Sequence, residues 1–328
     1  MLRRLGFVSV LLGCLMGVGS CGGGGGGGAA TGGAAPGGNG GAGGSGGAGA
    51  TGGAGGVFEP DLSPLGGERP VTPYVPSTYD GRTPAPLVVM LHGFSVSGSV
   101  QEILFQLKQQ ADRRGFIYLF PDGTQGADGK RFWNATDACC DFGGIGVDDV
   151  AYLSGLIDEA KRRFRVDSRR VYMLGHSNGG FMSYRFACEK PGVVTAIASL
   201  AGATFYDEAR CTPASPVSVL QMHGTEDPTV PYETGPMRGD QVMVPGAELT
   251  VERWAGLNGC AGGLIESGAA DYVAGDNGAE TERLAYEGCP AGGQVALWRM
   301  RGVGHIPGVN DDFRVDMVDW LLDQIKPE

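Results

Sequence analysis

The sequence predicts one α/β domain in which helices cover both faces of a mostly parallel sheet. Short apolar runs, each ending near a glycine or a turn, alternate with segments of helical periodicity. Buried parallel strands are continuous apolar runs, and strands that alternate with helices of this length are typical of such a sheet. Residues 57–328 are numerous enough to bury a core in a single large domain.

Each element follows from its local pattern. The strands are expected at Leu87–Leu91, Ile117–Phe120, Val171–Leu174, Ala196–Leu200, Val217–Met222 and Val295–Met300. The helices are expected at Gln101–Arg114, Val150–Phe164, Gly179–Glu189, Leu249–Leu257 and Asp311–Ile325. Pro73 and Pro76 restrict Val71–Val75 to an edge strand, because proline cannot donate to a sheet. Asp148 and Asp149 resemble a metal pair, but their place before a helix favours capping.

The first 20 residues have the features of a signal peptide. Arg3 and Arg4 precede the apolar stretch Leu5–Val18, which is too short to span a membrane. The small residues before Cys21 resemble a bacterial lipobox, so we expect lipidation at Cys21 of an exported chain. Cys14 is a weaker candidate, and a plain secretory signal is the alternative.

Residues 21–56 form a glycine-rich segment that we expect to be a flexible linker between the lipid and the domain. Its glycines keep no three-residue period, which excludes collagen. The net charge of −11 offers no basic face, which excludes nucleic acid as a partner. We expect a monomer that meets a membrane only through its N-terminal lipid.

Six cysteines follow Cys21, and an even number in an exported protein suggests disulfides. Of the fifteen possible pairings, Cys188–Cys211 and Cys260–Cys289 are favoured because each closes a loop of modest length. Cys139 and Cys140 then remain as a vicinal pair, free or bridged. CxxC and HxxxH spacings do not occur, so we expect no zinc or other metal.

Gly175–Gly179 contains the pattern G-x-S-x-G around Ser177. The same pattern at Gly43–Gly47 lies in the linker and has no such role. Ser177 follows a predicted strand and precedes a predicted helix, which is the setting of a nucleophile elbow. The glycines on either side avoid clashes in this tight turn.

Serine needs a base, and the chain has four histidines: His92, His176, His223 and His305. In this arrangement the chain order is serine, acid, histidine, which selects His305 as base, with His223 as the second choice. Asp227, in the turn after a predicted strand, is the expected acid that orients the histidine, and Glu226 is its alternative.

Negative charge that develops on a substrate oxygen needs backbone N–H donors. Asn178, directly after the nucleophile, should supply one. The loop after Leu87–Leu91 should supply the other from Phe94, with Ser95 as the alternative. Removal of one such donor typically lowers turnover by about 10²–10³.

A set of motifs occurs in a characteristic order. They are Leu91-His92-Gly93, Phe120-Pro121-Asp122-Gly123, Phe132-Trp133-Asn134, Val147-Asp148-Asp149-Val150, Gly175–Gly180, Asp227–Tyr232 and Gly304-His305. The ensemble resembles the polyhydroxybutyrate depolymerase and feruloyl esterase family of α/β-hydrolases, including its bacterial lipoprotein esterases. The resemblance covers about Tyr74–Ile325.

The resemblance implies an α/β-hydrolase fold and a triad of Ser177, Asp227 and His305, in agreement with the residue patterns. It also makes the Cys188–Cys211 and Cys260–Cys289 pairings reasonable. The family often has a tryptophan after the catalytic histidine, where this chain has Ile306-Pro307. An aromatic wall is therefore expected to be missing there.

Substrate contacts are expected from Trp133, His176 and Tyr232, although Trp133 serves equally well as a buried residue that holds Cys139 and Cys140. Gly202–Pro216 is too short for a separate lid domain. The expected activity is hydrolysis of feruloyl or acetyl esters of polysaccharide, or of polyhydroxyalkanoate oligoesters, without a cofactor. The alternatives are a serine peptidase of the prolyl-oligopeptidase type and a catalytically silent surface-binding lipoprotein.

Overall fold

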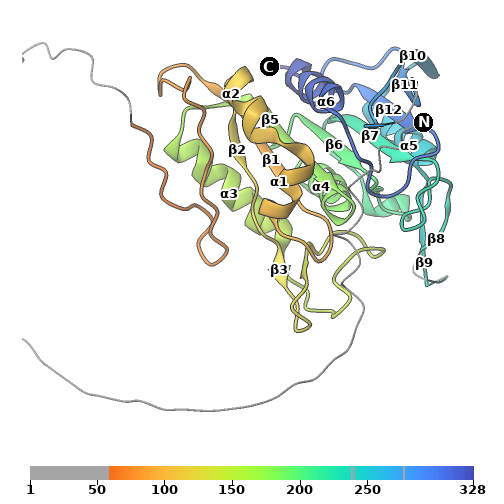
Figure 1. The fold of residues 1–328 in the computed structure, drawn as a ribbon, viewed down its shortest axis with the longest axis horizontal. Helices are drawn as coiled ribbons and strands as arrows, with labels where there is room; N and C mark the ends of the chain where they lie inside the picture. Colours follow the sequence, from red (N-terminus) through yellow and green to blue (C-terminus); the bar gives the residue numbers. More distant parts are fainter. Residues whose placement is uncertain (1–58, 238, 240, 276–277) are drawn as a thin grey trace, which may run out of the picture. The chain divides into compact units, whose positions relative to one another are not determined.

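The computed structural model describes residues 59–237, 239, 241–275 and 278–328. The predicted signal peptide, lipidation at Cys21 and linker lie outside these residues. The described part contains an eight-stranded sheet in the order β10-β11-β12-β7-β6-β5-β1-β2 (Figure 1). Its strands are β1 (Ala85–Leu91), β2 (Ile117–Leu119), β5 (Val166–His176), β6 (Ala196–Leu200), β7 (Ser218–Gly224), β10 (Leu264–Ala270), β11 (Thr281–Tyr286) and β12 (Val295–Met300).

The strands from β12 to β2 pair in parallel, whereas β10 and β11 are antiparallel additions at one edge. β10 is the outermost strand, and its pairing with β11 shifts register between Glu266 and Gly268. Two short ribbons lie outside the sheet: β3 (Thr124–Gln125) with β4 (Arg131–Phe132), and β8 (Gly235–Met237) with β9 (Val242–Val244).

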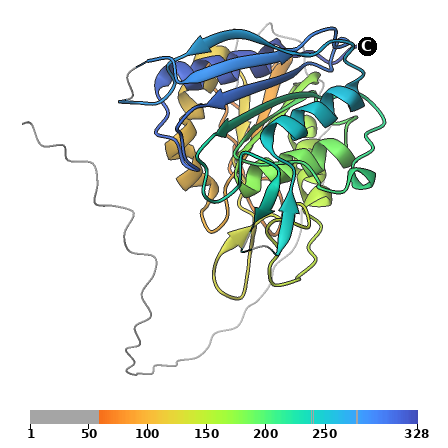
Figure 2. The same cartoon turned by 90° about the vertical axis from the view of Figure 1, so that its right-hand side faces the viewer.

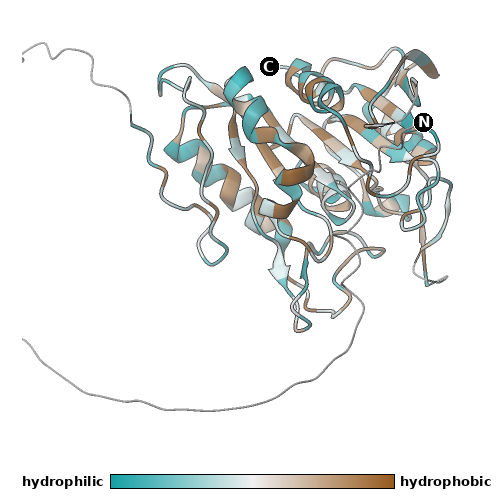
Figure 3. Cartoon of the chain, in the orientation of Figure 1, coloured by the Kyte–Doolittle hydropathy of each residue, from teal (hydrophilic) through white to brown (hydrophobic). Residues whose placement is uncertain are grey.

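Helices cover both faces of this sheet (Figure 2). One buried cluster contains side chains of α3 (Asp149–Arg163), α4 (Asn178–Glu189) and α5 (Ala247–Asn258). The other contains side chains of α1 (Gly98–Phe105), α2 (Leu107–Arg114) and α6 (Asp311–Asp323). Successive strand residues point to opposite faces, so Val88 joins the second cluster and Val89 the first. Hydrophobic residues gather in the central strands between these helix layers (Figure 3).

The predicted fold class and all six predicted strands are confirmed. The single helix predicted over Gln101–Arg114 is wrong, because Gln106 has a left-handed backbone with φ of 50° and separates α1 from α2. The Glu102 carboxylate accepts from the amides of Leu107 and Lys108 and so stabilises the break. Among the described helices, none is long and apolar enough to cross a membrane.

Val71–Val75 is not a strand. Val71 forms only an isolated bridge with Leu65, and Tyr74 forms one with Tyr118 of β2. The two prolines therefore prevent continuous strand pairing in this segment, so that even the predicted edge strand does not form. β10 and β11 were missed because most of their side chains are partly or fully exposed, so they lack a continuous apolar run.

The turn between β5 and α4 is tightly packed against β1. Ser177 there has φ of 53° and ψ of −119°. A Cβ on Gly175 would lie 2.2 Å from the backbone carbon of Gly179, and a Cβ on Gly179 would lie 2.1 Å from the carbonyl oxygen of Leu91. Both positions therefore exclude every side chain, and the turn holds Ser177 at the end of the sheet.

Two buried histidines adjoin this turn. His92 follows β1, donates from Nδ1 to the Gly93 carbonyl and accepts at Nε2 from the Gly123 amide. His176 is the last residue of β5. Burial lowers the pKa of each from 6.5 to about 4, so both rings are neutral at pH 7.

We predict that Gly179→Ala destabilises the protein by about 3 kcal/mol, because the new methyl group overlaps the backbone of β1. Gly155→Ala is the matched control, since Gly155 lies in α3 and a Cβ added there would have nothing within 4 Å. It should stabilise the fold by about 0.5–1 kcal/mol. Urea unfolding measures both, and equal midpoints for the two variants would contradict the packing described for the turn.

We also predict that stability falls as the pH drops from 6.5 to about 4. A histidine with a lowered folded-state pKa takes up its proton more readily in the unfolded chain, so protonation favours unfolding across this window. Urea midpoints measured between pH 7 and pH 4 should decline, and His92→Gln should decline less steeply than the unchanged chain. Parallel curves for both would show that His92 does not contribute.

Candidate active site

The predicted site residues follow four parallel strands, at the end of the sheet where the carboxyl ends of those strands meet. Phe94 follows β1, Ser177 follows β5, Asp227 follows β7 and His305 follows β12. Carboxyl ends of parallel strands meet at the same edge, where α/β proteins bind their ligands. The labels of these strands can be followed in Figure 1.

Asp227 and His305 are in direct contact. His305 Nδ1 donates to Asp227 Oδ2 over 2.7 Å. The other carboxylate oxygen, Oδ1, accepts from the amides of Thr229 at 2.7 Å and Val230 at 2.9 Å. Glu226, the alternative acid, is exposed. The geometry therefore places Asp227, rather than Glu226, behind the His305 ring.

The surroundings of Asp227 keep it ionised. Burial alone would raise the pKa of its carboxyl group, but contacts with His223 and His305 and the bond from the Val230 amide outweigh burial. The pKa of Asp227 consequently lies well below its usual range. An ionised acid can both orient the His305 ring and stabilise its protonated form.

His176 connects the nucleophile turn to the histidine loop. Its Nε2 donates to the backbone carbonyl of His305 over 2.9 Å, and the two rings lie 5.0 Å apart. Since His176 directly precedes Ser177, this bond fixes the His305 backbone relative to the serine. The substrate contact predicted for His176 is not what the structure shows, because the ring is buried and its Nε2 is used in this bond.

Asn178 begins α4, where backbone N–H groups have no partner inside the helix. Its side chain accepts from the Trp133 amide at 2.7 Å and donates to the Trp133 carbonyl at 2.9 Å. This pair of hydrogen bonds to a neighbouring loop fixes the start of the helix next to Ser177. The Ser95 amide donates to the Arg131 carbonyl, which leaves Phe94 as the better second oxyanion donor.

Trp133 and Tyr232, for which substrate contacts are predicted, are both buried. Trp133 is 0% exposed and donates from its indole to the His92 carbonyl. Tyr232 is buried too, and its hydroxyl accepts from Arg299 and donates to Glu248. The buried Trp133 matches the alternative interpretation, in which it holds the loop of Cys139 and Cys140. The supporting contacts of Tyr232 with Arg299 and Glu248 are not evident from its sequence position.

The predicted capping role is confirmed for Asp148 but not for Asp149, whose side chain contacts other parts of the chain. Asp148 accepts from the Ala151 amide at the start of α3. Asp149 is fully buried, forms an ion pair with Arg69 over 2.6 Å and accepts from the Asn134 amide. Burial is the largest influence on Asp149 and raises its pKa despite the arginine.

Three disulfides are present in the described residues. They are Cys139–Cys140, Cys188–Cys211 and Cys260–Cys289, the pairs that the sequence favours or leaves open. Cys188–Cys211 joins the end of α4 to the short helix η1 (Glu208–Arg210) in the loop after β6. Cys140 also donates its amide to the Trp133 carbonyl, so Trp133 and this pair are connected.

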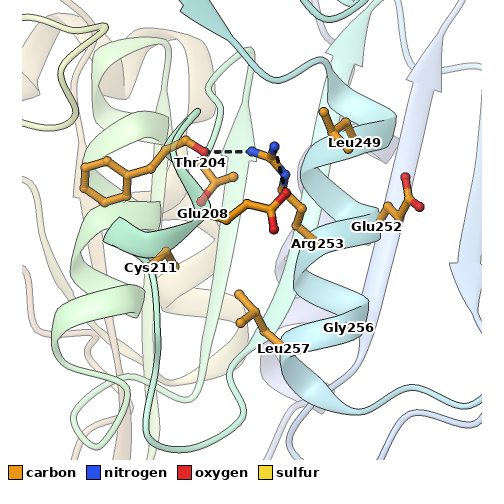
Figure 4. A pocket seen from close by; sticks show the side chains of 9 residues that line it. Thr204, Glu208, Cys211, Leu249, Glu252, Arg253, Gly256 and Leu257 are labelled. Atoms are coloured by element: carbon orange, nitrogen blue, oxygen red, sulfur yellow. Dashed lines mark hydrogen bonds and ion pairs between the residues drawn. The ribbon is translucent and has the colours of Figure 1, made fainter.

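Two cavities lie near these loops. One of about 340 Å³ is bordered by Phe94 and by the loop that carries Cys140, Phe142 and Ile145. The other, of about 400 Å³, lies between the loop after β6 and α5 (Figure 4). There Arg253 is tied to Glu208 and to the carbonyls of Phe205 and Tyr206. Ser177, Asp227 and His305 line neither of these two cavities. The first cavity adjoins the predicted oxyanion loop and is the better candidate for substrate.

Comparisons with known proteins agree with this fold. The family described as Esterase PHB depolymerase matches residues 74–234. Feruloyl esterase B of Piromyces equi is 32% identical over 71% of this chain and 42% of its own length. The putative esterase NocK of Nocardia uniformis subsp. tsuyamanensis is 32% identical over 49% of this chain and 45% of its own. The chain thus spans less than half the length of these two relatives.

Among solved structures, an acetyl xylan esterase from Aspergillus awamori superposes with a TM-score of 0.53 at 17% identity, and the match covers 80% of this chain and 96% of that one. At this identity the likeness concerns the fold. The matching family, the curated relatives and the shared architecture lead to one conclusion. The chain belongs to the polyhydroxybutyrate depolymerase and feruloyl esterase family of α/β-hydrolases.

Proposed function

We propose that the chain is an exported serine esterase that hydrolyses carboxylic esters through an acyl-enzyme. This proposal rests mainly on the 2.7 Å hydrogen bond between His305 Nδ1 and Asp227 Oδ2. The bond lies at the carboxyl ends of the parallel strands, where Ser177 also occupies its strained turn. A nucleophile, a base and an acid that orients the base are the parts that acyl transfer needs. The esterase names of the relatives support the same reaction class.

In this mechanism Ser177 Oγ attacks the ester carbonyl while His305 Nε2 takes the hydroxyl proton. The amides of Asn178 and Phe94 hold the oxygen that becomes negative. His305 then gives the proton to the alkoxy oxygen, the carbon–oxygen bond breaks and the alcohol leaves. Water, deprotonated by His305, attacks the acyl-enzyme, and the departing Ser177 recovers the proton.

The cavity beside Phe94 favours an acyl group with a flat apolar ring. The Phe94 and Phe142 rings lie 5.2 Å apart, and Ile145 extends the same wall. Phe142 and Ile145 are 47% and 50% exposed, so both can be covered by a ligand. This wall supplies the aromatic surface that is missing after His305. An aromatic acyl ester of a polysaccharide therefore fits better than acetate or a hydroxybutyrate oligomer.

Export is part of the proposal. Three disulfides are typical of oxidising compartments outside the cytosol. The lipid at Cys21 and the linker remain predictions from the sequence. An esterase held at a bacterial surface would meet polysaccharide esters that cannot enter the cell.

We predict that Ser177→Ala abolishes ester hydrolysis, whereas Asp227→Asn lowers kcat by about 10⁴ because the amide no longer holds the correct His305 tautomer. Release of acid from methyl ferulate by the full chain measures both, and circular dichroism checks the fold. Wild-type turnover by a folded Ser177→Ala variant would end the proposal.

We predict that methyl ferulate is preferred over acetylated xylan and 3-hydroxybutyrate oligomers. Phe142→Ala should lower kcat/KM for methyl ferulate about 3- to 10-fold, since an aromatic pair contributes about 0.5–1.5 kcal/mol, and should leave 4-nitrophenyl acetate nearly unaffected. Ile103→Ala is the matched control, because Ile103 is 73% exposed on α1, outside the cavity lining. Equal losses for both esters would remove Phe142 from the acyl site. Preferential release of 3-hydroxybutyrate would instead indicate polyester turnover.

A further inference from the structure

We propose that His223 is a positioning residue that holds the triad acid Asp227 through a buried chain of hydrogen bonds. The inference rests on the proposed catalysis by Ser177, Asp227 and His305. In the sequence, His223 is only a second choice for the base. The structure gives it a different place, beside the acid.

His223 lies in β7 with a side chain that is 1% exposed, and its Nε2 is 3.4 Å from Asp227 Oδ2. The same Nε2 donates to the Val230 carbonyl over 3.0 Å. Asp227 Oδ2 is therefore approached by ring nitrogens of two histidines, since His305 Nδ1 is 2.7 Å away. Only one histidine can act as base, and His305 has the shorter contact.

The neighbours of His223 determine which of its nitrogens carries the proton. Gln221 Nε2 donates to the Gly202 carbonyl over 2.8 Å and lies 3.0 Å from His223 Nδ1. The Gln221 oxygen accepts from the Tyr184 hydroxyl over 2.8 Å. A carbonyl only accepts, so the amide nitrogen of Gln221 must face Gly202 and His223. Nδ1 is consequently an acceptor, and the neutral ring presents its N–H at Nε2.

This orientation places His223 near both oxygens of the acid, one through the Val230 turn and one by direct proximity. The Val230 carbonyl that accepts from His223 belongs to the residue whose amide donates to Asp227 Oδ1 over 2.9 Å. His223 thus fixes the turn that binds Oδ1 and also lies against Oδ2. Without the Nε2–H of His223, the Asp227 carboxylate would rotate more freely and bind a proton more tightly.

Charged and titratable groups from several elements face His223. Asp227 is the acid beside it, and the Tyr232 ring packs edge-on at 5.8 Å. Arg299 is the partner of His223 in the pairing of β12 with β7. Its guanidinium is tied to Glu248 and Glu282. His176 and His305 complete the surroundings on the Asp227 side. A second proton on His223 would oppose the Gln221 donor.

The test compares His223→Met with His223→Gln, two side chains of similar length of which only Gln has an N–H. In the Met variant we expect kcat for the best ester to fall about 10-fold with KM within about twofold. The acid limb of kcat/KM should move up by about 0.5–1 pH unit, because the Asp227–His305 pair takes up its proton more readily. His223→Gln should restore both values toward those of the unchanged chain.

Tyr272→Phe is the control for the loss of a hydrogen bond far from Asp227, since its hydroxyl donates to the partly exposed Asp316 of α6 over 2.7 Å. It should leave the acid limb in place. The proposal would be overturned if a folded His223→Met variant kept the acid limb of kcat/KM unchanged. It would also be overturned if His223→Met, His223→Gln and Tyr272→Phe all moved that limb by the same amount. Ser177→Ala is measured in parallel. If that variant kept wild-type ester turnover, the proposed function itself would fail, and the positioning role of His223 would fail with it.

A measurement on the unchanged chain does not depend on how variants fold. Nitrogen NMR can distinguish the tautomers of the four histidines. His223 should be neutral with its proton on Nε2 at pH 7. A proton on Nδ1, or a charged ring, would overturn the proposal.

Discussion

The geometry of the site depends on backbone-to-backbone contact between the turn at residues 175–179 and the end of β1. Gly175 and Gly179 have no room for a Cβ, because carbonyl and helix backbone atoms occupy that space. Their absence of side chains lets α4 begin directly behind the strand. Ser177 is then forced into a left-handed conformation that a residue elsewhere in the fold would rarely adopt. The compact turn therefore determines both the backbone conformation of Ser177 and the start of the helix next to it.

Around this turn, buried polar side chains connect loops that are distant in sequence. His92 connects the loop after β1 to Gly123, Asn178 connects α4 to Trp133, and His176 connects β5 to His305. Each bond is largely shielded from water, where an unmade partner would be costly. In each of these bonds the partner group is a backbone amide or carbonyl. The bond therefore does not depend on which side chain the partner residue carries.

The sequence was most informative where a pattern was local. Continuous apolar runs identified the central strands, and the glycines around Ser177 identified the elbow, because both reflect short-range sterics. Chain order favoured His305 over His223 but left Glu226 as an alternative to Asp227, and only the structure shows which carboxylate contacts His305. Gln106 was harder, because its left-handed backbone depends on a carboxylate from Glu102 rather than on its own side chain.

The roles of aromatic and buried polar residues required three-dimensional information. Trp133 and Tyr232 occur in motifs near the site, yet the structure directs them inward, against His92 and Arg299. Nothing in their spacing separates a residue that lines a cavity from one that supports it. Phe142 contacts Phe94 from a loop distant in sequence, whereas His223 contacts Asp227 and Val230 in the turn that follows its own strand. Neither contact belongs to a regular sequence period, so neither could be predicted from the pattern.

The outer strand β10 has a consequence for how copies of this protein behave at high concentration. An unpaired sheet edge can act as a template for strands of other molecules. In β10 the charged side chain of Glu266 is exposed, and the register irregularity before Gly268 interrupts an even row of backbone donors and acceptors. Such an edge is a poor template, so the addition of strands from other molecules at β10 is disfavoured even when the protein is concentrated.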